Sequence, residues 1–141
     1  MKSKAPLLLM EQMIMLLVFA LAAALCLQSF TYSDRLSRRG EARDTAATLS
    51  QTAAETVRHQ GGTPEEALSA AAAALGGTFD GETLKAGYDQ EGNPGGEEFL
   101  LTVRPVSTDV PGLAKVSVQV EWGREILFEI DSAWQEVTVT G

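Results

Sequence analysis

A single carboxylate, Glu11, interrupts the apolar N-terminal stretch of this chain. It follows the apolar residues from Leu7 to Met10 and precedes, after one glutamine, an unbroken apolar run from Met13 to Leu27. An ionised side chain inside a membrane segment costs on the order of a few kcal/mol, so it usually has a partner or a task. Two explanations stay open. Glu11 lies about one turn from the lipid headgroups and reaches water, or it is a docking charge for the amino terminus of another subunit.

No catalytic constellation accompanies this carboxylate. His59 is the only histidine, so a catalytic triad and a His-based metal site are excluded within one chain. Pro94 lies in a loop that loosely resembles a calcium-binding loop, but it stands where such loops place glycine, which favours an ordinary solvated loop. The oxygen-bearing side chains of this loop are Asp89, Glu91, Asn93 and Glu97. The sequence therefore predicts no enzyme, no bound metal and no cofactor.

A predicted membrane helix over residues 7–30 must position Glu11. Its 24 residues extend over roughly 36 Å as a helix, which exceeds the ~30 Å hydrocarbon core of a bilayer. A secretory signal is the alternative, because Lys2 and Lys4 precede the apolar stretch and Ala22 to Ala24 offer small residues for cleavage. The apolar stretch is longer than a usual signal core, and such a core has no use for Glu11. The sequence therefore favours a membrane helix.

Charge is distributed unevenly behind this helix. Residues 34–59 hold five Arg and four acidic residues, whereas residues 60–141 hold four basic and fourteen acidic residues, a net charge of −10. Such a segment should avoid nucleic acid, because phosphate backbones require clustered Lys and Arg.

Basic residues stand on both sides of the apolar helix, so a count of positive charges does not decide its orientation. The only cysteine, Cys26, lies in the apolar run, which excludes an intramolecular disulfide.

The helix is expected to continue beyond the membrane, over residues 31–60, as a stalk that leads into a C-terminal head. This stretch contains no proline, and Gly61 and Gly62 are expected to end it. A helix–sheet packing stripe is predicted on one face, because small and apolar residues recur there at intervals of three or four. Its members are Ala42, Ala46, Leu49, Ala53 and Val57.

The head, residues 61–141, is expected to contain a short second helix followed by strands. Thr63, Pro64 and Glu66 form a capping-box pattern, and Gly76 and Gly77 should stop the helix after about Leu75. Beyond Thr78 the apolar residues alternate with polar ones, as in half-buried antiparallel strands. The expected strands are Thr83 to Tyr88, Phe99 to Arg104, Val116 to Trp122 and Ile126 to Asp131, with a possible extension from Trp134 to Val139.

Turn signals join these strands into a meander. Gly123 and Arg124 suit a two-residue hairpin, and Asp109 to Gly112 form the preceding turn. A sheet with one apolar face needs a cover, and the alanine-rich stripe is the obvious candidate. The predicted fold class is α+β, with a long N-terminal helix, membrane-spanning in its first half, packed on a C-terminal antiparallel β-meander. Trp122, Phe128 and Trp134 are expected in the core or on a sheet face.

This order of parts resembles the type IV pilin and pseudopilin family. The similarity covers the whole chain: a short basic leader over residues 1–6, an apolar helix with Glu11 five residues from its start, a polar continuation and an antiparallel sheet. The resemblance implies leader cleavage between Pro6 and Leu7 by a prepilin peptidase, although Pro6 stands where the family usually has glycine. Atypical processing and an uncleaved, membrane-resident accessory protein are therefore both open.

The resemblance also implies a role for Glu11. In the family this glutamate attracts the freed amino terminus of a neighbouring subunit, because opposite charges attract more strongly in a medium of low dielectric constant. The implied partners are membrane lipid, other pilin-like subunits and their assembly machinery. The implied location is a single-pass membrane protein with an extracytoplasmic head. The expected function is a structural or accessory subunit of a type IV pilus-like or type II secretion-like filament. The alternative is a membrane-anchored or secreted binding domain without a filament role.

Overall fold

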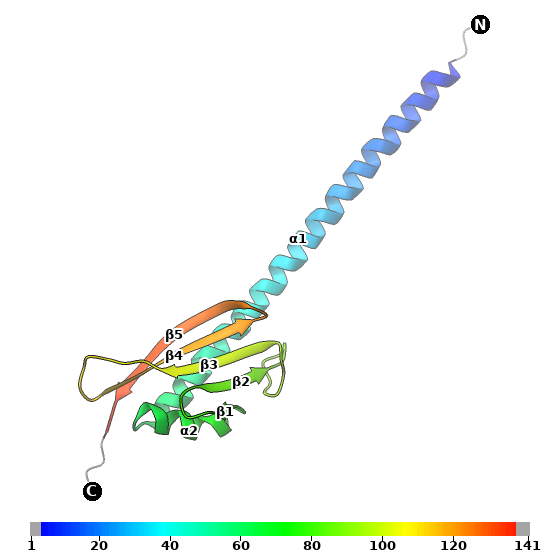
Figure 1. The fold of residues 1–141 in the computed structure, drawn as a ribbon. Helices are drawn as coiled ribbons and strands as arrows, with labels where there is room; N and C mark the ends of the chain where they lie inside the picture. The colour runs from blue at the N-terminus through cyan, green and yellow to red at the C-terminus, as the bar shows by residue number, and fades with distance from the viewer. Residues whose placement is uncertain (1–3, 138–141) are drawn as a thin grey trace. The chain divides into compact units, whose positions relative to one another are not determined.

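The computed structural model describes residues 4–137 as two helices and five strands (Figure 1). The chain forms two compact units, one up to Arg39 and one from Gly40 onward. The elements are α1 (Ala5–Gln60), α2 (Pro64–Ala74), β1 (Thr78–Phe79), β2 (Leu84–Tyr88), β3 (Phe99–Pro105), β4 (Leu113–Trp122) and β5 (Glu125–Gln135). The fold is therefore α+β, with the long N-terminal helix packed on an antiparallel sheet, and the predicted fold class is confirmed.

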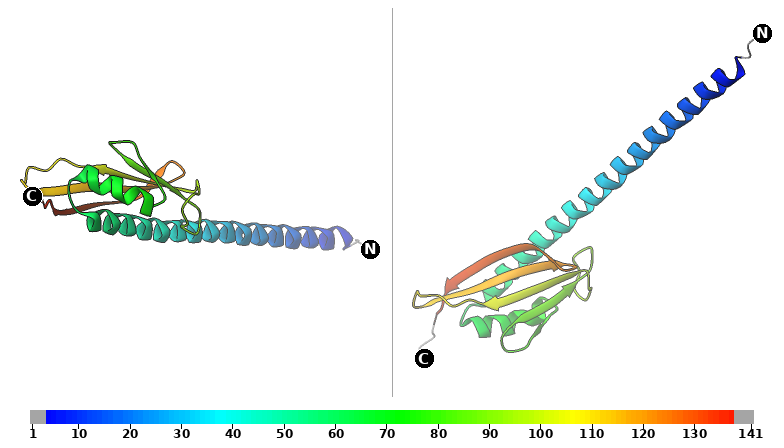
Figure 2. Two further views of the ribbon diagram at one scale, coloured as in Figure 1. Left: turned by 90° about the horizontal axis from the view of Figure 1, so that it is seen from below. Right: turned by 45° about the horizontal axis from the view of Figure 1, so that its top comes forward.

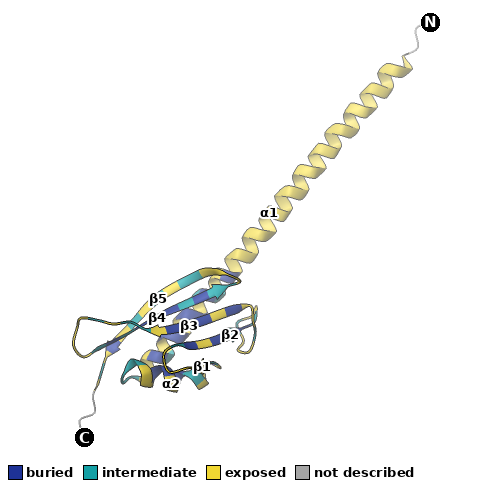
Figure 3. Cartoon of the chain, viewed as in Figure 1, coloured by how far each residue is buried: buried dark blue, intermediate teal, exposed yellow. Residues whose placement is uncertain are grey.

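The first unit contains the part of α1 that precedes Gly40. All its described side chains are exposed, including the large apolar ones from Leu7 to Phe30 (Figure 3). Helix α1 runs without interruption to Gln60, as the absence of proline from residues 31–60 predicted. Gly61 and Gly62 follow it with φ angles of +66° and +77°, a conformation that glycine adopts without steric cost.

The second unit is built on one antiparallel sheet in the order β1-β2-β3-β4-β5. Consecutive strands are neighbours, so the sheet is the simple meander that the turn signals predicted. Trp122 pairs with Glu125 across the two-residue turn Gly123-Arg124, and Gly123 has a φ angle of +66°. Helix α2 packs against β1 to β4, and both helices lie on the same face of the sheet (Figure 2).

The core lies between this sheet face and the two helices. All five residues of the predicted packing stripe lie in this core: Ala46, Ala53 and Val57 are fully buried, and Ala42 and Leu49 are at most 9% exposed. Inward-facing residues of β2, β3 and β4 meet them at the centre of the core. Those that are fully buried there are Leu84, Leu101, Val103, Val116, Val118 and Val120.

Helix α2 begins as the capping-box pattern predicted. The Thr63 side chain accepts a hydrogen bond from the Glu66 backbone N–H, and the Glu66 carboxylate accepts one from the Thr63 backbone N–H. Leu75 caps the other end, and Gly76 follows with a φ angle of +66°. Since each contact joins residues close in the sequence, this helix could be predicted without knowledge of the tertiary structure.

Two strand predictions were incomplete or wrong. Strand β1 was not foreseen, because two residues are too few to show alternation. Ile126 was expected to share the face of Phe128, but a β-bulge near Val120 and Glu121 shifts the register. Ile126 is consequently 48% exposed, and its neighbour Leu127 packs against the core in its place. An inserted residue reverses the faces of all residues on one side of it.

The last strand extends beyond the alternating apolar and polar residues from Ile126 to Asp131, as expected. Strand β5 continues through Trp134 to Gln135, and the Trp134 indole N–H donates a hydrogen bond of 3.0 Å to the Gly62 carbonyl oxygen. Trp134 is 7% exposed and belongs to the core, whereas Trp122 and Phe128 are half-buried. Val139, the expected end of this extension, lies outside the described residues.

Candidate functional site

Glu11 lies on the exposed apolar surface of α1. Residues three or four positions away share its side of the helix, and Leu8, Ile14 and Met15 are between 54% and 65% exposed. The first part of α1 is long and apolar enough to cross a membrane, by length and composition alone. A carboxylate in these surroundings has the chemistry to pair with an amino group or to accept hydrogen bonds from a neighbouring chain.

The predicted cleavage bond between Pro6 and Leu7 lies in the first turn of α1. The helix begins at Ala5, and the Leu8 N–H donates a hydrogen bond of 3.1 Å to the Lys4 carbonyl oxygen. Proline is tolerated in a first turn, because the N–H groups there have no intrahelical partner. A peptidase would therefore have to unwind one terminal turn to reach this bond, and helix ends are the parts that fray most readily.

Arginines follow the apolar part of α1. Arg35, Arg38 and Arg39 are all exposed, and the Nε of Arg38 lies 3.2 Å from a carboxylate oxygen of Asp34, one turn earlier. Exposed ion pairs of this kind contribute little to stability, typically ~0.2–1 kcal/mol. The position of these arginines beyond the apolar segment suits contact with lipid headgroups, where long basic side chains extend toward the interface.

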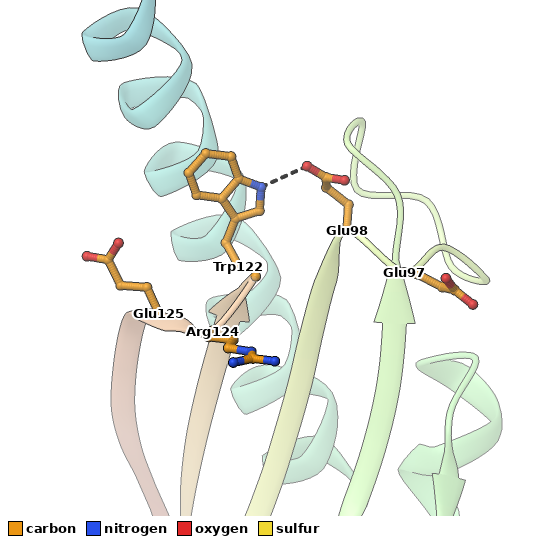
Figure 4. Close-up of a pocket in the computed structure, with 6 residues that line it drawn as sticks. Glu97, Glu98, Trp122, Arg124 and Glu125 are labelled. Carbon is orange, nitrogen blue, oxygen red and sulfur yellow. Dashed lines mark hydrogen bonds between the residues drawn. The ribbon is translucent and has the colours of Figure 1, made fainter.

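An acidic depression in the second unit was not predicted as a site. The Trp122 indole N–H donates a hydrogen bond of 2.8 Å to the Glu98 carboxylate, and Arg124 and Glu125 lie at the adjacent hairpin (Figure 4). The register of β3 and β4 sets Phe99 opposite Trp122, which brings Glu98 to the indole. The depression is open to solvent and is lined by Glu97, Glu98, Trp122, Gly123, Arg124 and Glu125.

The calcium-like loop uses its first carboxylate to hold its own turn. One Asp89 carboxylate oxygen accepts a hydrogen bond of 2.8 Å from the Asn93 backbone N–H, and the other accepts one of 3.1 Å from the Asn93 side chain. These bonds stabilise the ionised form and lower the pKa of Asp89 below 3.8. Among residues 4–137, no three His, Cys, Asp or Glu side chains form a group that could hold a metal ion.

His59 lies exposed in the last turn of α1, near the negative end of the helix dipole. Ser50 was missed by the sequence analysis although it is fully buried within the packing stripe. Its hydroxyl donates to the carbonyl oxygens of Ala46 and Ala47, at 2.7 and 3.0 Å, so its polar atom is satisfied inside the helix. Ser50 follows Ala46 by four residues, and this spacing alone could have predicted that it shares the buried face of the helix.

No family model, no curated protein and no solved structure matches this chain.

Proposed function

We propose that this protein is a structural or accessory subunit of a bacterial type IV pilus-like or type II secretion-like filament, anchored by the first part of α1. The observation that carries the proposal is the use of one uninterrupted helix for two purposes. Its first part exposes apolar side chains around Glu11, and its last turns form the core of an antiparallel head. A membrane anchor merely attached to a binding domain does not need to supply that domain's core.

The chemistry of Glu11 supports the same proposal. Lateral association of apolar helices in lipid gains little from hydrophobicity, because the lipid tails are equally apolar. A carboxylate on such a surface is therefore a specific attractive group for a cation of a neighbouring subunit. A freed amino terminus at Leu7 would carry such a cation close to the same level of the helix. If the leader stays attached, Lys2 or Lys4 would have to supply it.

Sequencing of the amino terminus of the mature protein, purified from membranes of its host, tests this proposal. A chain that begins at Leu7 would support processing as a pilin-like subunit. A chain that begins at Leu25 or later would instead indicate a secreted domain, and the filament role would be wrong. An intact Met1 would leave an unprocessed membrane protein, and association with pilin-like subunits would then have to be shown by co-purification.

The proposed orientation places the head outside the cytoplasm and can be tested with a membrane-impermeant thiol reagent. Glu82→Cys introduces a thiol at an exposed position of the head. This variant would also carry Cys26→Ala, so that only the introduced thiol reacts. Labelling of Glu82→Cys in intact spheroplasts is expected, and labelling only after the membrane is permeabilised would refute the orientation.

A further inference from the structure

The two edges of the sheet differ in how they are covered. Strand β1 pairs with the first two residues of β2, Leu84 and Lys85. The loop that follows β2 returns along the rest of it, where the Gly95 N–H donates a hydrogen bond of 2.9 Å to the Gly87 carbonyl oxygen and Tyr88 forms a bridge with Pro94. Covered edges of this kind prevent pairing with other strands. The β2 edge is therefore closed to an additional strand.

Strand β5 forms the opposite edge and is the longest strand of the sheet, with 11 residues. It pairs with β4 along its length, and among residues 4–137 no strand pairs with its other side. Residues 129–135 form a regular ladder with β4, so every second residue of this stretch directs its backbone N–H and C=O groups away from the sheet. Such a row of groups is a template for another strand.

A groove runs beside this edge and has an apolar floor. Ala54, which is 6% exposed, and the half-buried Ile130 contribute apolar surface to it. An added strand would lie about 4.8 Å from β5, above this groove, and alternate side chains would point into it. The complete lining comprises Gln51, Ala54, Glu55 and Arg58 of α1 and Ile130, Asp131 and Ser132 of β5.

The outer face of the β5 edge is acidic. Glu129 and Asp131 are exposed there, and the Nζ of Lys115 lies 2.8 Å from a carboxylate oxygen of Asp131. A neighbouring strand with Lys or Arg on this face would form cross-strand pairs of opposite charge, which stabilise a sheet. Pairing with a second copy is disfavoured in the registers centred on this acidic stretch. A two-fold axis at Ile130 would set Glu129 opposite Asp131, and an axis at Asp131 would set two aspartates opposite each other.

We propose that the open edge of β5 binds an extended segment of a partner protein as a sixth strand, with apolar side chains toward the groove and basic side chains toward Glu129 and Asp131. The backbone groups of β5 provide the hydrogen bonds. The groove beside Ala54 and Ile130 selects small or branched apolar residues, and the acidic face selects Lys or Arg. This proposal does not depend on the filament role, because it concerns only the second unit.

The experiment uses the full chain in a neutral detergent and a capped peptide of about eight alternating Val and Lys residues, within the usual length of a strand. Affinity is measured by titration, and amide hydrogen exchange is measured along β5. Addition of the peptide should slow exchange of the outward-directed amides between residues 129 and 135. A peptide of the same sequence with methylated backbone nitrogens at alternate residues should not bind, since it cannot complete the ladder.

Two charge-reversal variants provide the matched comparison. Glu129→Lys changes the edge strand, whereas Glu121→Lys makes the same change on the same face of the inner strand β4. Loss of one exposed ion pair should weaken peptide binding roughly twofold to fivefold in Glu129→Lys, and Glu121→Lys should have a smaller effect.

Four results would overturn the proposal. Equal weakening by the two variants, or equal binding of the methylated peptide, would show that the acidic head attracts cations without forming a strand pair. No slowing of exchange in β5 at saturating peptide would show that the edge is closed. Slowing of exchange that increases with protein concentration alone would assign the edge to a second copy of the chain.

Discussion

Replacement of Ala53 by Trp tests the contact between α1 and the sheet. Ala53 is fully buried in the core cluster that also contains the inward-facing residues of β3 and β4. Its methyl group is the whole side chain, and the core encloses it completely. An indole has no space there unless the helix moves or neighbouring side chains leave their preferred rotamers.

Overfilling a packed core typically costs ~1–3 kcal/mol. Near the midpoint, a loss of 1 kcal/mol lowers the melting temperature of a domain of this size by about 4–8 °C. Ala53→Trp should therefore lower the melting temperature by roughly 4–24 °C. Glu55 lies on the exposed side of the same helix, and Glu55→Gln should change stability by less than about 0.5 kcal/mol.

The assay is thermal and denaturant unfolding of a soluble fragment that begins at Asp34 and contains the second compact unit. Thr52→Trp provides a second control, since it introduces the same side chain at an exposed position one residue away. It should unfold close to the parent fragment. If Ala53→Trp unfolds at the same temperature as Glu55→Gln and Thr52→Trp, the helix does not cover the sheet at this position. The main structural support for a pilin-like head would then be lost.

Three further predictions concern other parts of the chain. Glu11→Ala should insert into membranes normally but co-purify less with partner membrane proteins, and equal co-purification would refute the docking role. Glu11→Leu should insert at least as well as the parent, because it removes a charge. Thr63→Ala removes the N-cap of α2 and should cost ~0.5–2 kcal/mol in denaturant unfolding, and an unchanged midpoint would show that the cap is dispensable. Hydrogen bonds from the backbone N–H groups of Thr83 and Glu82 lower the pKa of Asp80 below 3.8. The stability from ionised Asp80 is thus present above pH 3.8 and is lost as the pH falls through the lowered pKa. Asp80→Asn should reduce this loss of unfolding free energy at low pH, in unfolding measured at several pH values. An unchanged dependence of the unfolding free energy on pH would contradict the assignment.

The acidic head has a consequence for binding that is separate from the fold. The strands carry their acidic residues on the solvent-facing side, where Lys115 is paired with Asp131 and Arg104 donates a hydrogen bond of 2.7 Å to Gln119. These contacts use two of the four basic residues that follow residue 60. The unbalanced negative charge therefore favours basic partners and should make their association depend on salt concentration.

The sequence by itself determined the features that depend on neighbouring residues. The capping box at Thr63 joins residues three positions apart, and the turn at Gly123 needs one residue with a positive φ angle. The packing stripe through Ala53 follows from helical spacing, because every member must face the same side of one helix. The apolar residues around Glu11 likewise belong to a single helix. For these features the physical cause and its sequence signal lie within a few residues of each other.

Only the tertiary structure decided the features that depend on strands far apart in the sequence. The bulge that exposes Ile126 and buries part of Leu127 arises from the pairing of β4 with β5, and alternation alone cannot show where an extra residue enters. The return of the loop at Gly95 closes one sheet edge, and the absence of a strand beyond β5 in the described residues leaves the other open. Whether a sheet edge is closed or open depends on backbone hydrogen bonds, which every residue type except proline can donate. The two edges therefore leave little trace in the identity of the side chains.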